Sequence, residues 1–599
     1  MASRIPRLVL ILGFTLIAVL WLAACGGGGE ITPTSAPIPT REAAATPTAS
    51  GPTPTPLTGI AATLHTVQQR FPNPPPVPPW PPKVGGQFRT LSGDFASRDP
   101  GQYYAAYIYG GVYNSLLEDK IGLYYQETFY TPNVVGDLAE KWEQKDPLTY
   151  VFYLRKGVKW QNIAPVNGRE VTAEDVKWSY EKYMQEPLTK HKLRDMAKME
   201  VLDKYTLQMT LKAPYGGFLE KLASPGYVQW ILAKEVADMP GAFKDNSVGS
   251  GPFVLTRFTP GEGWQMDRNA DYWERDKDGT KLPYLDSVRA YYIPDVATQF
   301  AAFRSKQVDN IEPSMIRQID DLLKTNPDIF IRRIPPRTGW GGNILLFRLD
   351  KAPWNDVRVR RAVSMALDRE KMNQNVFDGD AYPLPPMPWA MAGFTDWPPK
   401  TEWLGKYYQY NPEEAKRLLA EAGFPNGFKT TITYVQTTSP WADALIIEQD
   451  NLRKIGIDAE IKALDAAAYT ASLYNKGWDN LRYGGPITGG YDFDDWVYVP
   501  HYTGSPVNYD GMSDPEIDRL LDKHRAEQSE QERAKLARQI WDTLTDKVYR
   551  VTNITPHRYN VTHPYVQNYA ENTYAWAPYY GSHQIVTTWL EMDAPGRKK

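Results

Sequence analysis

The stretch KTTITYVQTTSPWADALIIEQDNLRKIGIDAEIKAL, residues 429–464, decides the fold class of this 599-residue chain. It opens with eight residues of strand composition, continues with a helical segment and closes with a second strand. Gly456 is expected to end the helix, and Ile457, Ala459 and Ile461 to share one face of the second strand. A strand, a helix and a strand in this order form a βαβ unit with two parallel strands. The sequence therefore predicts an α/β fold.

Capped helices and alternating strands continue on both sides of this unit. NPEEAKRLLAEAGFP predicts a helix that begins after Asn411 and ends at Gly423. NDVRVRRAVSMALDREKM predicts another that begins after Asn355, and SEQERAKLARQIWDTL a third that begins after Ser529. TYVFYLRKGVKW, residues 149–160, alternates as a strand. Helices and strands are mixed along the whole chain, which predicts an α/β protein with more than one lobe.

The first 25 residues have the pattern of an export signal. Arg4 and Arg7 precede an apolar run at residues 8–22, which is shorter than the ~20 residues that span a bilayer. The run ends in Leu-Ala-Ala-Cys, which resembles the lipobox of bacterial lipoproteins. That resemblance implies a signal peptide at residues 1–24 and a lipid on Cys25; a plain secretory peptide is the alternative. Cys25 is the only cysteine, so no disulfide can form within the chain.

Residues 25–83 are expected to be a disordered tether. Fifteen prolines lie between residues 26 and 82, in a segment that is also rich in Thr and Ala. Such a composition cannot bury a core and favours extended conformations. The rest of the chain is too long for one simple core and predicts two or three subdomains. The net charge is −3 and no long basic run occurs, so nucleic acid is not an expected partner.

Motifs for catalysis, cofactors or metals are scarce. The sequence contains no G-x-S-x-G and no glycine-rich nucleotide loop. Ser179 and Lys182 match S-x-x-K, but they lie inside an expected amphipathic helix and no K-T-G triplet occurs. The seven histidines never pair as H-x-x-x-H. We therefore expect no enzyme activity, no cofactor and no metal site.

Motifs in the middle of the chain resemble those of a known family. DPLTYVFYLRKGVKWQN is followed by PVNGREVTAEDVKWSYEKY, and further motifs follow in the same order: SVGSGPFVLTRFTPGEGWQMDRNADYW, VATQFAAFRSKQVDNIE, APWNDVRVRRAVSMALDREKM, YNPEEAKRLLAEAGFPNGF, LRKIGIDAEI and SDPEIDRLLDK. The set resembles the extracytoplasmic solute-binding proteins of family 5, the dipeptide, oligopeptide and nickel receptors of ABC importers. The resemblance runs from about residue 85 to about residue 589.

The resemblance implies a two-lobed periplasmic-binding-protein-like fold of type II, in the large class with an extra subdomain. The two α/β lobes would close on a solute about a hinge. Lobe one would be discontinuous, at residues 84–116, 226–345 and 546–599. The extra subdomain would occupy residues 117–225, and lobe two residues 346–545.

The function that the resemblance implies is solute capture for an importer. A monomeric lipoprotein, held at the outer face of a bacterial cell membrane, would bind a di- or oligopeptide and deliver it to the permease subunits. Some relatives bind oligosaccharides, which makes a sugar the alternative ligand. A secreted glycosidase is the alternative from a different class, because paired carboxylates at the right separation can hydrolyse a glycoside.

The cluster YDFDDWVYVPHY, residues 491–502, is the strongest candidate site. In relatives that bind peptides, an aspartate of this segment meets the ligand's α-amino group, and the register favours Asp492 first and Asp494 second. In an extended segment these two carboxylates would share a face, and Asp495 would point away. The structural alternative is that Asp494 or Asp495 caps the next helix, with Trp496 and Tyr498 in the core. Trp496 stands where relatives usually carry proline.

Aromatic residues complete the predicted site. Tyr103 and Tyr104 lie where relatives contact the ligand backbone, and Trp340 lies in a glycine-rich stretch suited to close approach. Sugars would need aromatic faces for stacking. The residues that could supply those faces are Trp340, Trp389, Trp397 and Tyr491.

Overall fold

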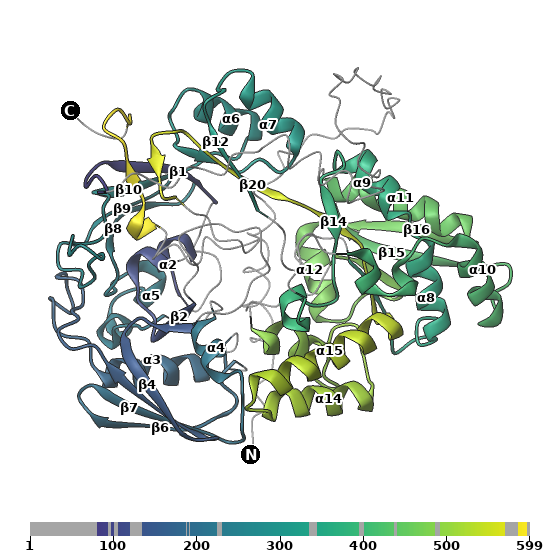
Figure 1. The fold of residues 1–599 in the computed structure, drawn as a ribbon, viewed down its shortest axis with the longest axis horizontal. Helices are drawn as coiled ribbons and strands as arrows, with labels where there is room; N and C mark the ends of the chain where they lie inside the picture. Colours follow the sequence, from purple (N-terminus) through teal and green to yellow (C-terminus); the bar gives the residue numbers. More distant parts are fainter. Residues whose placement is uncertain are drawn as a thin grey trace, which may run out of the picture.

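The structure is a computed structural model. It describes residues 81–93, 98–100, 106–119, 134–186, 189–190, 192–224, 230–334, 344–394, 400–436, 440–484, 492–569 and 585–595. Two lobes lie side by side, and strand β20 (Arg558–Thr562) runs between them (Figure 1). We name them the first lobe, whose core includes Phe88 and Val288, and the second lobe, whose core includes Leu345 and Val551.

The βαβ unit that defines the fold class is present in the second lobe. Strand β15 (Phe428–Val435), helix α11 (Pro440–Lys454) and strand β16 (Ile457–Leu464) follow one another. The two strands pair in parallel along their whole length. They belong to a five-stranded sheet with the order β16-β15-β17-β13-β18, which also contains β17 (Leu481–Tyr483), β13 (Ile344–Phe347) and β18 (Arg550–Thr552). The predicted α/β class is confirmed.

Helices surround this sheet and form a second core beside it. Their bounds are α8 (Val357–Ala366), α9 (Arg369–Val376), α10 (Pro412–Glu421), α12 (Ala466–Tyr474), α14 (Pro515–Ala526) and α15 (Glu530–Lys547). Asn411 caps α10 and Ser529 caps α15, as predicted. Helix α8 begins one residue later than predicted, because Asp356 and not Asn355 accepts the backbone N–H of Arg358.

The first lobe contains two four-stranded sheets that share one hydrophobic core. The first sheet has the order β1-β10-β9-β8, from β1 (Gln87–Ser92), β10 (Ser287–Tyr292), β9 (Gly263–Arg268) and β8 (Phe253–Thr259). The second is antiparallel, with the order β4-β5-β7-β6, from β4 (Ala139–Asp146), β5 (Thr149–Leu154), β7 (Thr206–Leu211) and β6 (Met196–Asp203). Short strands β2 (Leu117–Asp119) and β3 (Val134–Gly136) pair beside them.

Among the described residues of the first lobe, the α-helices are short apart from one. They are α2 (Ala106–Val112), α3 (Ala173–Gln185), α4 (Phe218–Ala223), α5 (Ala242–Asp245), α6 (Val296–Arg304) and α7 (Ile316–Leu323). Helix α3 begins after its cap residue Thr172 and contains Ser179, which is buried and donates its hydroxyl to a backbone carbonyl. Ser179 therefore has a structural role.

The chain crosses between the lobes near one edge of the molecule. Strand β12 (Phe330–Ile334) of the first lobe precedes β13 of the second, and the chain returns through β18, β19 (Ile554–Pro556) and β20. Strand β20 pairs with β12 and with β11 (Asn310–Ile311), and β19 pairs with β14 (Ala381–Pro383). The buried Asp380, next to β14, accepts hydrogen bonds from Arg333 of β12 at 2.6 Å and from Tyr559 of β20. These contacts fix the crossing strands to each other.

The predicted domain boundaries remain a prediction. The second lobe's sheet includes β13 and β18, which begin at Ile344 and Arg550. It therefore extends slightly beyond residues 346–545 at both ends.

Among the described helices, none combines the length and the apolar character that a membrane crossing needs.

Candidate functional site

The cluster at residues 492–502 is helical. A π-helical turn at Asp494–Tyr498 (η8) continues into α13 (Val499–His501). The prediction of an extended segment was therefore wrong. The carboxylate of Asp492 accepts the backbone N–H of Asp495 at 3.1 Å, so Asp492, and not Asp494 or Asp495, caps the turn. In this helical geometry Asp492 and Asp495, three positions apart, lie on one side.

Two buried lysines of the first lobe meet these carboxylates. Lys221, in helix α4, donates to Asp495 Oδ1 at 2.7 Å and to both carboxylate oxygens of Asp492 at 3.3 Å. Lys192 forms a salt bridge with Asp495 Oδ2. All four side chains are at most 4% exposed. Two cations and two anions thus form a buried cluster without net charge, which we call the ion cluster.

Burial and charge act in opposite directions within the ion cluster. Burial, with the negative charge of Asp495 beside it, raises the pKa of the Asp492 carboxyl above its usual value. Burial alone would do the same to Asp495, but the ammonium groups of Lys192 and Lys221 outweigh it and lower the pKa of that carboxyl. Burial would likewise lower the pKa of Lys221, but the carboxylates of Asp492 and Asp495 raise it instead. Asp495 is thus the most strongly held anion.

Asp494 points to a second set of charges. Arg525 of α14 donates to Asp494 Oδ1 at 3.0 Å and to Asp195 Oδ1 at 3.0 Å, and Arg194 lies 3.6 Å from Asp494. The Arg525 guanidinium also lies over the ring of Tyr215, 4.5 Å from its centroid. Asp494 therefore contributes to an arginine-centred network and not to the ion cluster.

Both networks join the two lobes. Lys192 and Lys221 are adjacent to Leu193 and Leu222 in the core of the first lobe, whereas the aspartates precede Val497 in a core of the second. Figure 1 shows α4 facing α14 and α15 at the edge opposite to β20. The lobes are therefore connected by strands on one side and by buried charges on the other.

Backbone contacts bring the lobes close at this interface. The N–H of Gly216 donates to the carbonyl of Arg525 at 2.9 Å. A Cβ atom on Gly216 would lie 1.9 Å from the carbonyl oxygen of Glu527, which is too close for any side chain. Glu220 and Arg533 add an ion pair at 3.4 Å. Glycine is therefore required where the lobes meet.

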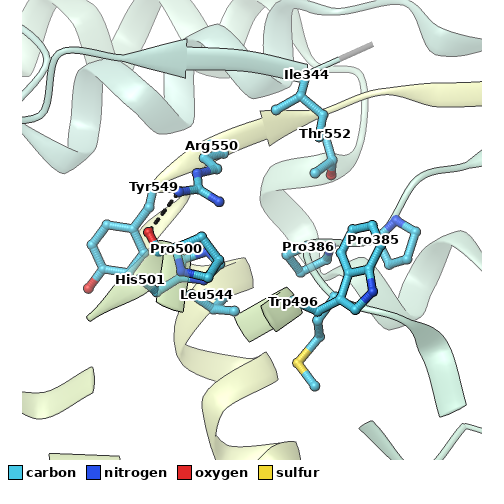
Figure 2. Close-up of a pocket in the computed structure, with 11 residues that line it drawn as sticks. Ile344, Pro385, Pro386, Trp496, Pro500, His501, Leu544, Tyr549, Arg550 and Thr552 are labelled. Atoms are coloured by element: carbon cyan, nitrogen blue, oxygen red, sulfur yellow. Dashed lines mark hydrogen bonds between the residues drawn. The ribbon is translucent and has the colours of Figure 1, made fainter. Parts of the chain in front are cut away.

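A cavity of about 40 Å³ lies in the second lobe and is lined by Trp496, the residue that follows Asp495 (Figure 2). Its wall is formed mainly by apolar and aromatic residues, among them Trp496, Pro386 and Ile344. Arg550, the cation in the wall, is neutralised by Asp510 at 2.6 Å. The Trp496 indole Nε1 is buried and has no hydrogen-bond partner among the described residues. The lining of the cavity suits a small apolar group.

The structure describes only some of the other predicted site residues. Trp389 is 1% exposed and packs against Phe394, Trp403 and Trp541. It is a core residue and has no ring face open for a sugar. The remaining predicted residues lie outside the described part of the chain: Cys25, Tyr103, Tyr104, Trp340, Trp397 and Tyr491.

Lys192 and Lys221 were missed by the sequence reasoning. A signal for Lys221 exists in FLEKLA, where the lysine lies three positions after Phe218 and therefore on the apolar face of its short helix. Lys192 precedes Leu193 and gives no comparable signal. Within the described ranges, no group of His, Cys, Asp and Glu residues has the geometry of a metal site.

The model of the bacterial extracellular solute-binding proteins, family 5, matches residues 133–509. The chain belongs to this family. It is a family of extracytoplasmic solute-binding proteins of ABC transporters and not of enzymes, so the glycosidase alternative falls away. The family that the sequence motifs indicated is confirmed.

Curated relatives of this solute-binding protein are named for several different ligands. Heme-binding protein A of Haemophilus influenzae is 26% identical over 513 residues, which cover 78% of this chain and 86% of the relative. The dipeptide-binding protein of Escherichia coli is 28% identical over 392 residues, 60% of this chain and 67% of the relative. The glutathione-binding protein GsiB of Escherichia coli is 27% identical over 409 residues, 66% and 71% of the two chains.

Solved structures share the fold. The periplasmic binding protein DppA of Helicobacter pylori, in complex with the peptide STSA, has a TM-score of 0.68 at 24% identity and covers 85% of this chain and 99% of its own. The oligopeptide-binding protein AppA of Bacillus subtilis, in complex with a nonapeptide, has a TM-score of 0.65 at 21% identity, with coverage of 85% and 100%. The predicted periplasmic-binding-protein fold is confirmed.

Proposed function

We propose that this ABC-transporter solute-binding protein captures a di- or oligopeptide between its two lobes. The observation that carries the proposal is the arrangement of the lobes, which are connected by strands at one edge and meet through buried charges at the other. A ligand enclosed in such a clamp leaves water, so its hydrogen bonds and charges gain strength. A solute with extra affinity for the closed state shifts the lobes further toward that state.

The peptide class is supported by two lines of reasoning. Several relatives are named for dipeptides or glutathione, and two related structures contain bound peptides. The cavity beside Trp496 also has the mainly apolar lining that a peptide side chain needs. Tyr103 and Tyr104 are predicted to contact the backbone of the peptide, and Trp340 lies in a glycine-rich stretch suited to close approach of the ligand.

Delivery to a permease and anchoring through a lipid on Cys25 complete the proposal. The proline-rich segment at residues 25–83 would let the receptor reach the permease while it stays attached to the membrane. Replacing Cys25 with serine should release the protein from the membrane fraction into the soluble one. If the variant stays in the membrane fraction, the lipid anchor is wrong.

Calorimetry with two ligand panels tests the ligand class. Peptides of two to five residues should bind, and oligosaccharides of similar size should not. Trp496→Ala should weaken binding of peptides that carry a large apolar side chain and leave glycine-rich peptides little changed, because only the former use the cavity. Binding of the sugars alone would contradict the proposal.

A further inference from the structure

The ion cluster is balanced without any contribution from a solute. Lys192 and Lys221 supply two positive charges, and Asp492 and Asp495 supply two negative ones. All four side chains are buried, so a change of one charge would leave an uncompensated charge away from water. A solute ammonium placed at Asp492 would be a third cation for two carboxylates.

Lys221 is held at this place by the protein itself. Its helix begins with Phe218 and ends with Ala223, both buried in the core of the first lobe. The neighbouring Glu220 pairs with Arg533 of the second lobe, and the backbone of Gly216 bonds to Arg525. The separate pairing of Asp494 with Arg525 adds a further interlobe contact. None of these contacts needs a solute.

We propose that Lys221 is an internal cation for Asp492 and Asp495. Its contacts with these carboxylates close the two lobes and make solute binding independent of an ammonium group on the solute. This inference rests on the proposed peptide-binding function for its choice of ligand. Lys221 is thus a specificity-determining residue: the receptor accepts peptides with blocked and with free amino termini. The cavity lined by Trp496, the residue next to Asp495, then contributes selectivity through apolar contacts.

Calorimetry with one peptide and its N-acetylated form tests the specificity. The wild-type protein should bind both forms within about threefold. Lys221→Met leaves the cluster with one excess negative charge, so it should bind the free-amine form at least tenfold more tightly than the acetylated form. The double variant Lys221→Met/Asp492→Asn restores neutrality and should again bind both forms alike. Wild-type protein that binds only the free-amine form would overturn the proposal.

A matched control separates charge effects at the cluster from those at the surface. Lys324 forms a salt bridge with Asp321, and both side chains are more than half exposed. Lys324→Met should therefore leave the ratio of the two affinities unchanged. If this variant shifts the ratio as Lys221→Met does, the effect is one of net charge and the proposal fails.

Closure can also be measured without any solute. Leu202 and Ile446 are exposed and lie in different lobes. Spin labels on Leu202→Cys and Ile446→Cys, in a Cys25→Ser background, report the distance between the lobes. The solute-free protein should show one short distance, and Lys221→Met should add a longer one. A distance distribution that Lys221→Met does not change would overturn the proposal.

The two measurements distinguish failure of this inference from failure of the proposed function. If no peptide binds but Lys221→Met opens the lobes, the ligand class is wrong and the internal cation stands. If peptides bind and acetylation abolishes binding to the wild-type protein, peptide binding stands and the internal cation is wrong.

Discussion

At the scale of single residues, the neighbours of each aspartate decide its role. The sequence contains three acids in one segment, and the family resemblance favoured Asp492 as the contact with the ligand. In the structure, Asp492 caps a turn and faces Lys221, Asp495 lies between two ammonium groups, and Asp494 binds Arg525. Lys192 and Lys221 lie 303 and 274 positions before Asp495, so no pattern within the segment could have predicted these partners.

Removal of the Asp495 charge should destabilise the protein strongly. Asp495→Asn leaves Lys192 and Lys221 with only one carboxylate, and breaking a buried ion pair in this way costs about 3–5 kcal/mol. Urea denaturation should show this loss in the free energy of unfolding. Asp321→Asn, in an exposed pair with Lys324, should change it by less than about 1 kcal/mol. If the two substitutions lower the free energy of unfolding equally, burial of the ion cluster does not add to its contribution to stability.

A second buried carboxyl predicts a pH dependence of stability. Burial raises the pKa of Glu448 to about 8, although Asn553 donates a hydrogen bond to it at 2.6 Å. An unfolded glutamate titrates near pH ~4.3, so between that pH and 8 the folded state holds one more proton than the unfolded state. Stability should therefore fall as the pH rises through this window, with a slope of about 1.4 kcal/mol per pH unit.

Glu448→Gln should remove this slope, because glutamine is neutral at every pH in the window. Denaturation curves at several pH values, measured for both proteins under the same conditions, give the difference directly. A slope that is the same in wild type and variant would show that Glu448 is ionised in the folded protein.

At the scale of helices and strands, local sequence was a good guide. The predicted βαβ unit, the caps at Asn411 and Ser529 and the strand that begins at residue 149 all agree with the structure. These features depend on side chains within a few positions of one another. The segment at Asp494–Tyr498 was expected to be extended but forms a helical turn, and Asp495 within it pairs with Lys192 of the first lobe.

The cap of helix α10 provides a test at this scale. The Asn411 side chain accepts the backbone N–H of Glu414 at 3.0 Å. Asn411→Ala should lower the free energy of unfolding by about 1 kcal/mol, because this N–H loses its partner. Asn411→Asp retains an acceptor and should be nearly neutral. If alanine and aspartate behave alike in urea denaturation, the side-chain cap does not contribute.

At the scale of the whole molecule, closure of the two lobes needs close backbone contact. Gly216 meets the carbonyls of Arg525 and Glu527 across the interface. The family resemblance predicted two lobes and a hinge from the sequence, but it could not predict which residues meet when the lobes close. That contact depends on the relative positions of segments about 300 residues apart, such as Gly216 and Arg525.

Gly216→Ala should hold the lobes apart. The added Cβ would collide with the carbonyl of Glu527, and overpacking of this kind costs about 1–3 kcal/mol. Because the cost falls on the closed state, peptide affinity measured by calorimetry should drop roughly tenfold or more. Gly477→Ala is the control, since its Cβ would have no neighbour closer than 3.6 Å. Unchanged affinity in Gly216→Ala would mean that binding does not use this closed arrangement.

The central claim is that the two lobes enclose a peptide, and native mass spectrometry of the purified protein tests it most directly. A receptor that removes its ligand from water should retain some of it through purification. The expected result is a set of added masses that correspond to short peptides and disappear after denaturation. Added masses spaced by hexose units, with no peptide masses, would contradict the account.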